Sequence, residues 1–191
     1  VLAYQSTPYL GYSRFAFNWS REGPYPPYDS WDAMAITLYN APNSRFRHNL
    51  VEHNLAGGLK IEGNTQPVFV EYNLFLSNDG GQYSAGIASL ADAPTIRNNV
   101  FAENRARGYI PSGNTAELSG NTFVRNQSFD NGGTAFGMSG GTHNIHHNTM
   151  VGNSGPATLH LPRSSAPVSI VQNNIVANST TYDGYLDYID L

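Results

Sequence analysis

Apolar and polar positions follow one another along this chain in a nine-residue pattern that recurs. The clear copies are FRHNLVEHN from Phe46, VEYNLFLSN from Val70, IRNNVFAEN from Ile96, LSGNTFVRN from Leu118, IHHNTMVGN from Ile145 and IVQNNIVAN from Ile170, with a weaker copy, FAFNWSRE, from Phe15. The copies align on Asn18, Asn49, Asn73, Asn99, Asn121, Asn148 and Asn173, at intervals of 31, 24, 26, 22, 27 and 25 residues. A regular period in this range predicts a repeat architecture.

Two apolar columns flank the aligned asparagines. The first, three residues before, holds Phe15, Phe46, Val70, Ile96, Leu118, Ile145 and Ile170; the second, two residues after, holds Val51, Phe75, Phe101, Phe123, Met150 and Ile175. This spacing is too short for a helix and predicts two short strands that meet at a corner. We place the corner at the asparagine itself, since Asn tolerates left-handed backbone conformation. Asparagines repeated from coil to coil at about 4.8 Å would form a hydrogen-bonded ladder.

A third strand is predicted in each period, because apolar residues alternate with others after every corner. The segments are AITL at 35, GLKI at 58, AGIAS at 85, YIP at 109, AFGM at 135, TLHL at 158 and YLDYI at 185. Three strands in a coil of about 25 residues describe an all-β parallel β-helix, whose core is closed by the stacking of coils. We expect about seven coils in a single domain, residues 1–191, which could itself be part of a longer solenoid.

Composition narrows the functional classes. Charged residues make up 13% of the chain, the net charge is −4, and Lys60 is its single lysine. This balance argues against a nucleic-acid partner. The chain has no cysteine, no apolar run of transmembrane length, no signal-peptide pattern and no initial methionine. We expect a mature protein, or a piece of a longer one, located outside the cell or at the cell surface.

The repeated I-x-x-N-x-F/I-x-x-N pattern, followed by G-I/L-x-I/L, resembles the right-handed parallel β-helix superfamily, the pectate-lyase-like fold. The resemblance covers nearly the whole chain and implies a right-handed solenoid. The superfamily includes polysaccharide lyases, glycoside hydrolases, uronate epimerases, phage tailspikes and non-catalytic surface proteins, so fold does not fix function. The stretch from Phe46 also resembles a coil of alginate C5-epimerases, but their Asp-Pro-His motif is absent here.

The resemblance implies a substrate groove along the outer face of the third strand, walled by the loops that enter it. Three such loops are extended: 20–34, 78–86 and 126–137. Aromatic residues in and near them could stack on sugar rings or simply pack on the coils. These candidate substrate-binding residues are Tyr25, Tyr28, Trp31, Tyr83, Tyr109 and Phe129. The outward positions of the third strand are expected at Thr37, Lys60, Ala88, Pro111, Gly137, His160 and Asp187.

The chemistry we favour is lyase-type β-elimination on an acidic polysaccharide. Some β-helix lyases use Lys or Arg as the base that removes the proton α to a uronate carboxylate, and Lys60 is our candidate. A solvated surface lysine is the alternative interpretation of Lys60. Arg105 and Arg107 could hold the sugar carboxylate. We assign catalytic roles to Lys60, Arg107 and Asp130, no metal site, and no cofactor except that calcium stays open.

Two other functions remain open. Glycoside hydrolysis needs two carboxylates about 5–10 Å apart, and the groove-side loops carry Asp29, Asp32, Asp79 and Asp130. A second candidate cluster is formed by His160, Arg163 and Asp187 near the end of the chain. The other function is a non-catalytic glycan-binding or structural module. Such a non-catalytic module would not need a base and a cation to lie together in one groove.

The remaining polar columns are interpreted as scaffold. Arg47, Glu71 and Arg97 occupy one outward column with alternating charge, which predicts a ladder of ion pairs; Glu103 and Arg125 predict another pair. His146 and His147 follow one another in a strand and are expected to point to opposite sides, which argues against a metal site.

An apolar column lies three residues after the aligned asparagines, where side chains should face outward. Its members are Leu76, Ala102, Val124, Val151 and Val176. An exposed apolar stripe can mark an interface. We expect either a homo-oligomer or a partner chain at this stripe and at the ends of the solenoid, where the sequence offers no capping helix.

Overall fold

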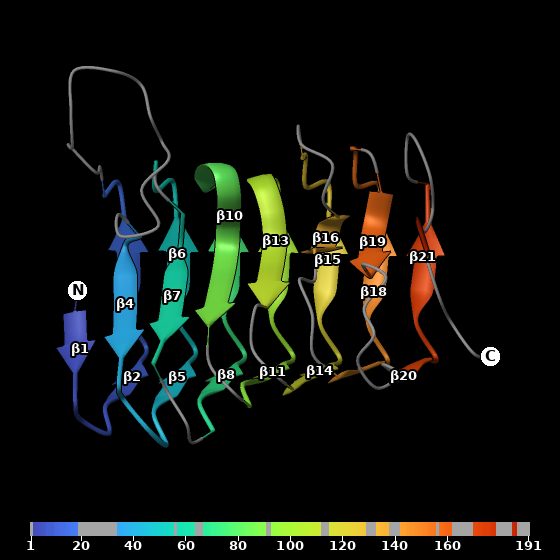
Figure 1. Ribbon diagram of the computed structural model, residues 1–191. Coiled ribbons are helices and arrows are strands. Elements are labelled where there is room, and N and C mark those ends of the chain that lie inside the picture. Colours follow the sequence, from blue (N-terminus) through green and yellow to red (C-terminus); the bar gives the residue numbers. More distant parts are fainter. Residues whose placement is uncertain are drawn as a thin grey trace.

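The structure, a computed structural model, is a solenoid of three parallel β-sheets that run side by side along one axis (Figure 1). It describes residues 2–18, 34–55, 57–63, 67–90, 93–111, 115–128, 133–137, 142–155, 157–161, 170–178 and 185–186. All the regular elements in this part of the chain are strands. The predicted all-β parallel β-helix is therefore confirmed.

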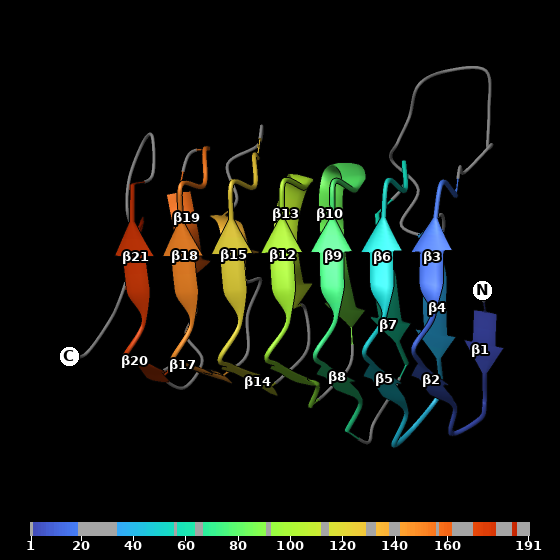
Figure 2. The ribbon, with the colours of Figure 1, turned by 180° about the vertical axis from the view of Figure 1, so that it is seen from behind.

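Each coil contributes one strand to each sheet, and the strands of a sheet follow one another in chain order. Sheet A contains β1 (Leu2–Tyr4), β4 (Ile36–Tyr39), β7 (Leu59–Glu62), β10 (Asp79–Leu90), β13 (Arg105–Pro111), β16 (Gly133–Gly137), β19 (Ala157–Leu161) and β22 (Tyr185–Leu186). Sheet B contains β2 (Tyr9–Gly11), β5 (Arg45–Arg47), β8 (Phe69–Glu71), β11 (Thr95–Arg97), β14 (Thr115–Ser119), β17 (Thr142–His146) and β20 (Ile170–Gln172). Sheet C contains β3 (Arg14–Ala16), β6 (Leu50–Glu52), β9 (Leu74–Leu76), β12 (Val100–Ala102), β15 (Thr122–Val124), β18 (Thr149–Val151) and β21 (Ile175–Ala177). Seen from behind, sheet C forms the near face of the solenoid (Figure 2).

The core is a set of apolar columns in which each side chain packs on its equivalent one coil away. On the inner side of sheet C, the rings of Phe75, Phe101 and Phe123 stack face to face, with centroids 4.9 and 4.5 Å apart and planes within 6° of parallel. All three side chains are fully buried. Offset stacking of this kind adds about 0.5–1.5 kcal/mol per pair to the gain from burial. The predicted apolar columns therefore form the core through these middle coils.

The predicted asparagine ladder runs along the corner between sheets B and C. Within it, the Nδ2 of Asn73 donates to Asn99 Oδ1 at 2.9 Å and to the backbone carbonyl of Phe46 at 2.8 Å. The same pattern links Asn49, Asn73, Asn99, Asn121, Asn148 and Asn174. These side chains satisfy backbone carbonyls that the turn would otherwise leave buried without a donor.

A second asparagine ladder lines the other end of sheet C. It links Asn18, Asn54, Asn78, Asn104, Asn126 and Asn153 through side-chain hydrogen bonds of 2.8–3.1 Å. Each of the strands β6, β9, β12, β15 and β18 is thus held between two corner asparagines, five residues apart in the sequence. This explains why the repeat carries an asparagine at both of those positions.

The left-handed residue of the corner is the one before the ladder asparagine. His48, Tyr72 and His147 have φ of 54°, 57° and 55° there, and Asn98 has 56°. The expectation that the ladder asparagine adopts the left-handed conformation was wrong. The side chain of the ladder asparagine turns inward and forms a hydrogen bond with the next coil. The residue before it makes the bend, and at some corners this residue is Tyr or His despite the strained conformation.

The register of the first and last copies also differs from the prediction. Asn18 belongs to the second ladder and Phe15 pairs with Val51, so the weak copy is offset by five residues. In the last copy, Asn174 rather than Asn173 accepts from Asn148, because Asn173 makes the left-handed bend with φ 54°. Inward positions there belong to Val171 and Val176, while Ile170 and Ile175 are 54% and 60% exposed.

The predicted charge ladder is present on the outer face of sheet B. Glu71 is fully buried between two arginines of the neighbouring coils. Arg47 Nε lies 2.8 Å from Glu71 Oε2, and Arg97 Nε donates to Glu71 Oε1. The Glu103–Arg125 pair also forms, at 2.6 Å, but both side chains are largely exposed. We assign the structural role to the Arg47–Glu71–Arg97 set rather than to the Glu103–Arg125 pair, because the Glu71 carboxylate is removed from water.

Candidate functional site

Lys60 is a buried lysine on the outer side of sheet A. It lies on β7, between Leu59 and Ile61, whose side chains are fully buried in the core, so strand alternation turns Lys60 outward. Its side chain is nevertheless 4% exposed, and its Nζ lies 2.7 Å from Glu62 Oε2. The alternative interpretation of Lys60 as a solvated surface lysine was wrong. The amine is removed from bulk water and has a carboxylate beside it, while Glu62 keeps 33% of its side chain exposed.

The register of sheet A defines a row of residues across the coils. Thr37 pairs with Lys60, and Lys60 pairs with Ala88, which in turn pairs with Ile110. Pro111 pairs with Ser89 and so falls one position out of this row. The sequence placed Pro111 in the row of Lys60 and Ala88, but the backbone register puts Ile110 there instead. The bulges in β10 shift its pairing with β13, which the sequence pattern does not reveal.

Arg105 and Asp79 form an ion pair at the first residues of β13 and β10. Arg105 Nη1 lies 3.5 Å from Asp79 Oδ2, and the arginine side chain is 62% exposed. Arg107 pairs with Ser84 in the backbone of β10. Arg107 lies three residues before Ile110 and two strands from Lys60, or about 14 Å between backbone positions at normal strand dimensions. Lys60 and Arg107 therefore lie on one sheet, but their backbone positions are not adjacent.

The other candidate residues are placed only in part. The described residues do not include Tyr25, Tyr28, Trp31, Phe129, Asp130, Arg163 and Asp187. Three further candidates have known backbone positions: Tyr83 lies within β10, Tyr109 pairs with Ile87 and Phe136, and His160 pairs with Gly137 and Tyr185. Their roles stay predictions.

The apolar column on the outer side of sheet C has one member different from the prediction. Leu76, Ala102, Val124 and Val151 share one register row, which Ala177 completes. Val176 instead pairs with Met150 and packs against the core, as the one-residue offset of the last copy requires. Ala102 is 8% exposed and the other members of the row are half-buried. An interface at this row stays a prediction.

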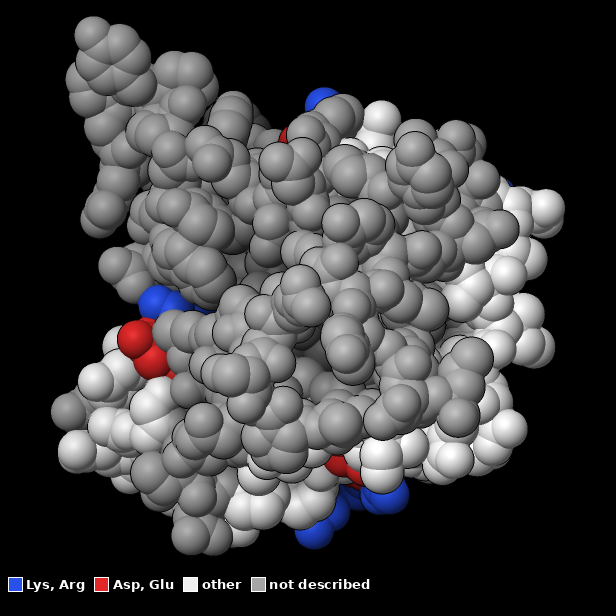
Figure 3. All heavy atoms as spheres, turned by 45° about the vertical axis from the view of Figure 1, so that its right-hand side comes forward, with Lys and Arg blue, Asp and Glu red and all other residues white. Residues whose placement is uncertain are grey.

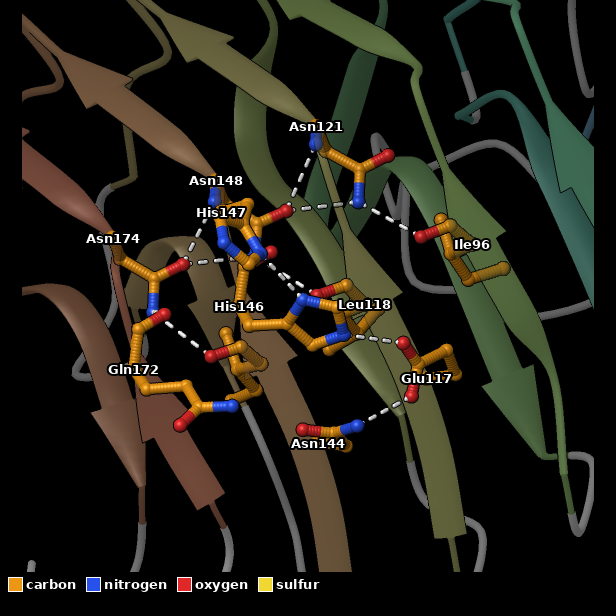
Figure 4. A network of polar contacts seen from close by, with 11 residues as sticks. Ile96, Glu117, Leu118, Asn121, Asn144, His146, His147, Asn148, Gln172 and Asn174 are labelled. Atoms are coloured by element: carbon orange, nitrogen blue, oxygen red, sulfur yellow. Dashed lines mark hydrogen bonds and ion pairs between the residues drawn. The ribbon is translucent and has the colours of Figure 1, made fainter.

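A cluster that the sequence analysis missed lies on the outer face of sheet B, on β14 and β17 (Figure 4). His146 Nε2 lies 2.5 Å from Glu117 Oε1, and His146 Nδ1 lies 2.8 Å from His147 Nδ1. The expectation that the two histidines point to opposite sides was wrong, because the left-handed backbone at His147 breaks strand alternation. The three residues lie up to 30 positions apart in the sequence. Only the pairing of β14 with β17 brings them together.

The charged side chains of the described residues include both signs close together. On the face shown in Figure 3, the coloured atoms of the described residues gather mainly in small groups in which blue adjoins red. Within the described part of the chain, no three or more histidine and carboxylate side chains meet in a group suited to a metal ion. That part also contains no helix long and apolar enough to cross a bilayer.

Comparison with known proteins identifies the fold family. The family model of the right-handed β-helix region matches residues 28–149, which is more than half of the chain. No curated protein and no solved structure matches the chain. The chain belongs to the right-handed β-helix family, and the function must be argued from its own residues.

Proposed function

We propose that this β-helix protein acts on an acidic polysaccharide by β-elimination, with Lys60 as the base. The observation that carries the proposal is the position of Lys60. Burying an amine on the outer side of a sheet costs free energy even when a carboxylate partners it, and buried titratable groups with a specific charged partner cluster at functional sites. Lysine in a desolvated position is a recurrent choice for a base in enzymes.

The proposed reaction uses the amine and its neighbouring carboxylate together. Once its ammonium ion has given up a proton, Lys60 takes the proton from the carbon α to the uronate carboxylate. The bond from the adjacent carbon to the glycosidic oxygen then breaks, which leaves a carbon–carbon double bond in one product and a new hydroxyl on the other after that oxygen gains a proton. Glu62, 2.7 Å from Nζ, would stabilise the ammonium ion that forms on Lys60.

The substrate would lie across the coils of sheet A rather than along one strand. Arg107 and the exposed Arg105 are on β13, two strands from Lys60. A polymer running across the strands would place one sugar at Lys60 while other carboxylates meet the arginines. This arrangement fits a polymeric substrate better than a single sugar.

The test is the ultraviolet absorbance of unsaturated products after incubation with pectate, alginate and glucuronate polymers, with and without calcium. Product from one polymer, lost in Lys60→Ala and retained in the matched surface variant Arg125→Ala, would support the proposal. If a folded sample gives neither unsaturated product nor new reducing ends with any polymer, the enzymatic proposal is wrong for these substrates.

A non-catalytic glycan-binding module is the second candidate function, and the Lys60–Glu62 pair favours it. An amine already engaged by a carboxylate at 2.7 Å is well suited to a fixed structural pair. In that case calorimetric binding of a polymer would be observed without any cleavage. Lys60→Met would then leave the affinity for the polymer unchanged.

A further inference from the structure

The Glu117–His146–His147 cluster has an ordered chain of contacts (Figure 4). Glu117 uses both carboxylate oxygens: Oε1 contacts His146 Nε2 at 2.5 Å, and Oε2 accepts from Asn144 Nδ2 at 2.7 Å. Asn144 and His146 both lie on β17, and Glu117 pairs with Asn144 in the adjacent strand. The carboxylate is therefore held by two neighbours on one strand and has little freedom to turn away.

These contacts fix where the protons lie. A carboxylate only accepts hydrogen bonds, so the Nε2 of His146 that faces Glu117 carries a proton. The other ring nitrogen of His146, Nδ1, faces Nδ1 of His147 at 2.8 Å. A contact of this length between two ring nitrogens requires a proton between them. One proton thus joins the two imidazoles.

The backbone keeps this pair in place. His146 is the last residue of β17, and His147 makes the left-handed bend with φ 55°. Asn148 follows at once and is locked in the buried ladder. One coil earlier, the same corner position is held by Gly120, which has no side chain to crowd the ring of His147. The backbone that carries the two imidazole rings is therefore held in place, and solvent can reach the rings.

We propose that His146 and His147 chelate a divalent transition-metal ion of the copper(II) type through their two Nδ1 atoms. The ion would replace the shared proton, which would move to the other ring nitrogen of His147. With metal–nitrogen bonds of about 2.0 Å, a separation of 2.8 Å corresponds to an angle near 90° at the ion. Tetrahedral coordination would need about 3.3 Å. Neighbouring corners of a square are the geometry that copper(II) and nickel(II) prefer, and copper(II) binds nitrogen ligands more tightly.

Glu117 completes the argument for a metal site. A histidine that binds a metal through one ring nitrogen usually donates its other N–H to a carboxylate, which orients the ring and makes it a stronger ligand. Glu117 already holds this position on His146. The Glu117 and His146 side chains are 37% and 22% exposed, and His147 is exposed, so water can fill the other coordination positions.

The test is titration of the purified chain with copper(II), nickel(II) and zinc(II) by calorimetry, with electron paramagnetic resonance of the copper form. We expect one high-affinity copper(II) ion per chain, a tetragonal spectrum split by two nitrogens, and affinity in the order copper, nickel, zinc. Glu117→Gln should weaken copper binding about 10- to 100-fold.

The chain itself supplies matched variants. Asn98 and Asn173 occupy the corner position of His147 on other coils, so His147→Asn should fold normally; Gln172 lies in the row of His146, so His146→Gln should as well. Each variant should lose at least about tenfold in copper affinity, while His53→Ala, a control on another coil, should lose none. Absence of binding, a spectrum with one nitrogen, equal binding by these variants or tighter binding of zinc would each overturn the proposal.

Discussion

Asn73 donates both its backbone N–H and its side-chain amide to the Oδ1 of Asn99, at 2.9 Å each, from one coil to the next. The same amide also donates to the carbonyls of Phe46 and Glu71. One buried side chain therefore ties together three successive coils. Since the link from one asparagine to the next repeats from Asn49 to Asn174, the ladder is a continuous polar seam beside the apolar core.

Asn99→Ala tests this seam. The substitution removes the acceptor of both Asn73 donors and leaves buried groups without partners, which costs about 1–3 kcal/mol for each such group. We expect a loss of about 2–4 kcal/mol in the free energy of unfolding, measured by urea denaturation. Asn98→Gly is the control, because Asn98 is exposed and its left-handed conformation suits glycine. Equal losses in both variants would contradict the ladder argument.

Gly108 lies against the phenyl stack and should not tolerate a side chain. A Cβ at this position would lie 2.8 Å from two ring atoms of Phe123 and 3.0 Å from the carbonyl oxygen of Ala135. Gly108→Ala should therefore destabilise the protein by about 1–3 kcal/mol through overpacking. Thermal unfolding of Gly108→Ala, Phe123→Leu and the double variant measures the coupling. A double variant as unstable as the sum of the two single ones would show that the ring is not the obstacle.

Glu71→Ala should be more damaging than Glu103→Ala. Glu71 is fully buried between Arg47 and Arg97, so its removal leaves two arginines facing each other beside a buried site. Because the arginines keep part of their exposure, we expect about 2–3 kcal/mol, somewhat less than for a fully buried pair. Glu103 pairs with Arg125 at the surface and should contribute less than about 1 kcal/mol. Chemical denaturation at low and high salt separates the two, since only the exposed pair should be weakened by salt.

Glu62→Gln should destabilise the protein through Lys60. The substitution leaves the buried Lys60 ammonium ion without its carboxylate, at a cost of about 1–3 kcal/mol. Lys60→Met removes the charge and keeps the volume, so adding it to Glu62→Gln should restore much of the stability. Urea denaturation of the two single variants and the double variant gives the coupling. Additive losses would indicate that the two side chains do not depend on each other.

Much of the scaffold could be predicted from the sequence, because its signals are local and repeated. The apolar residues two positions after each corner asparagine, such as Phe75 and Phe101, are buried as expected, and Asn73 to Asn148 form the ladder. Errors arose where the repeat is weak or doubled. The pair Asn173 and Asn174 offers two equivalent alignments, and only the hydrogen bond from Asn148 selects one of them.

The candidate sites were predicted less completely, for a physical reason. The period and polarity of the repeat determined, by themselves, a stack of three-stranded coils with an apolar interior and an asparagine seam, since each coil must bury the same face and satisfy the same turn. The tertiary structure decided which outward-facing residues contact one another. Burial of Lys60 beside Glu62 and convergence of Glu117 with His146 and His147 depend on the strand register and on a single left-handed residue. The pattern of apolar positions contains no signal for either of these contacts, because it indicates only which side of the strand faces the core.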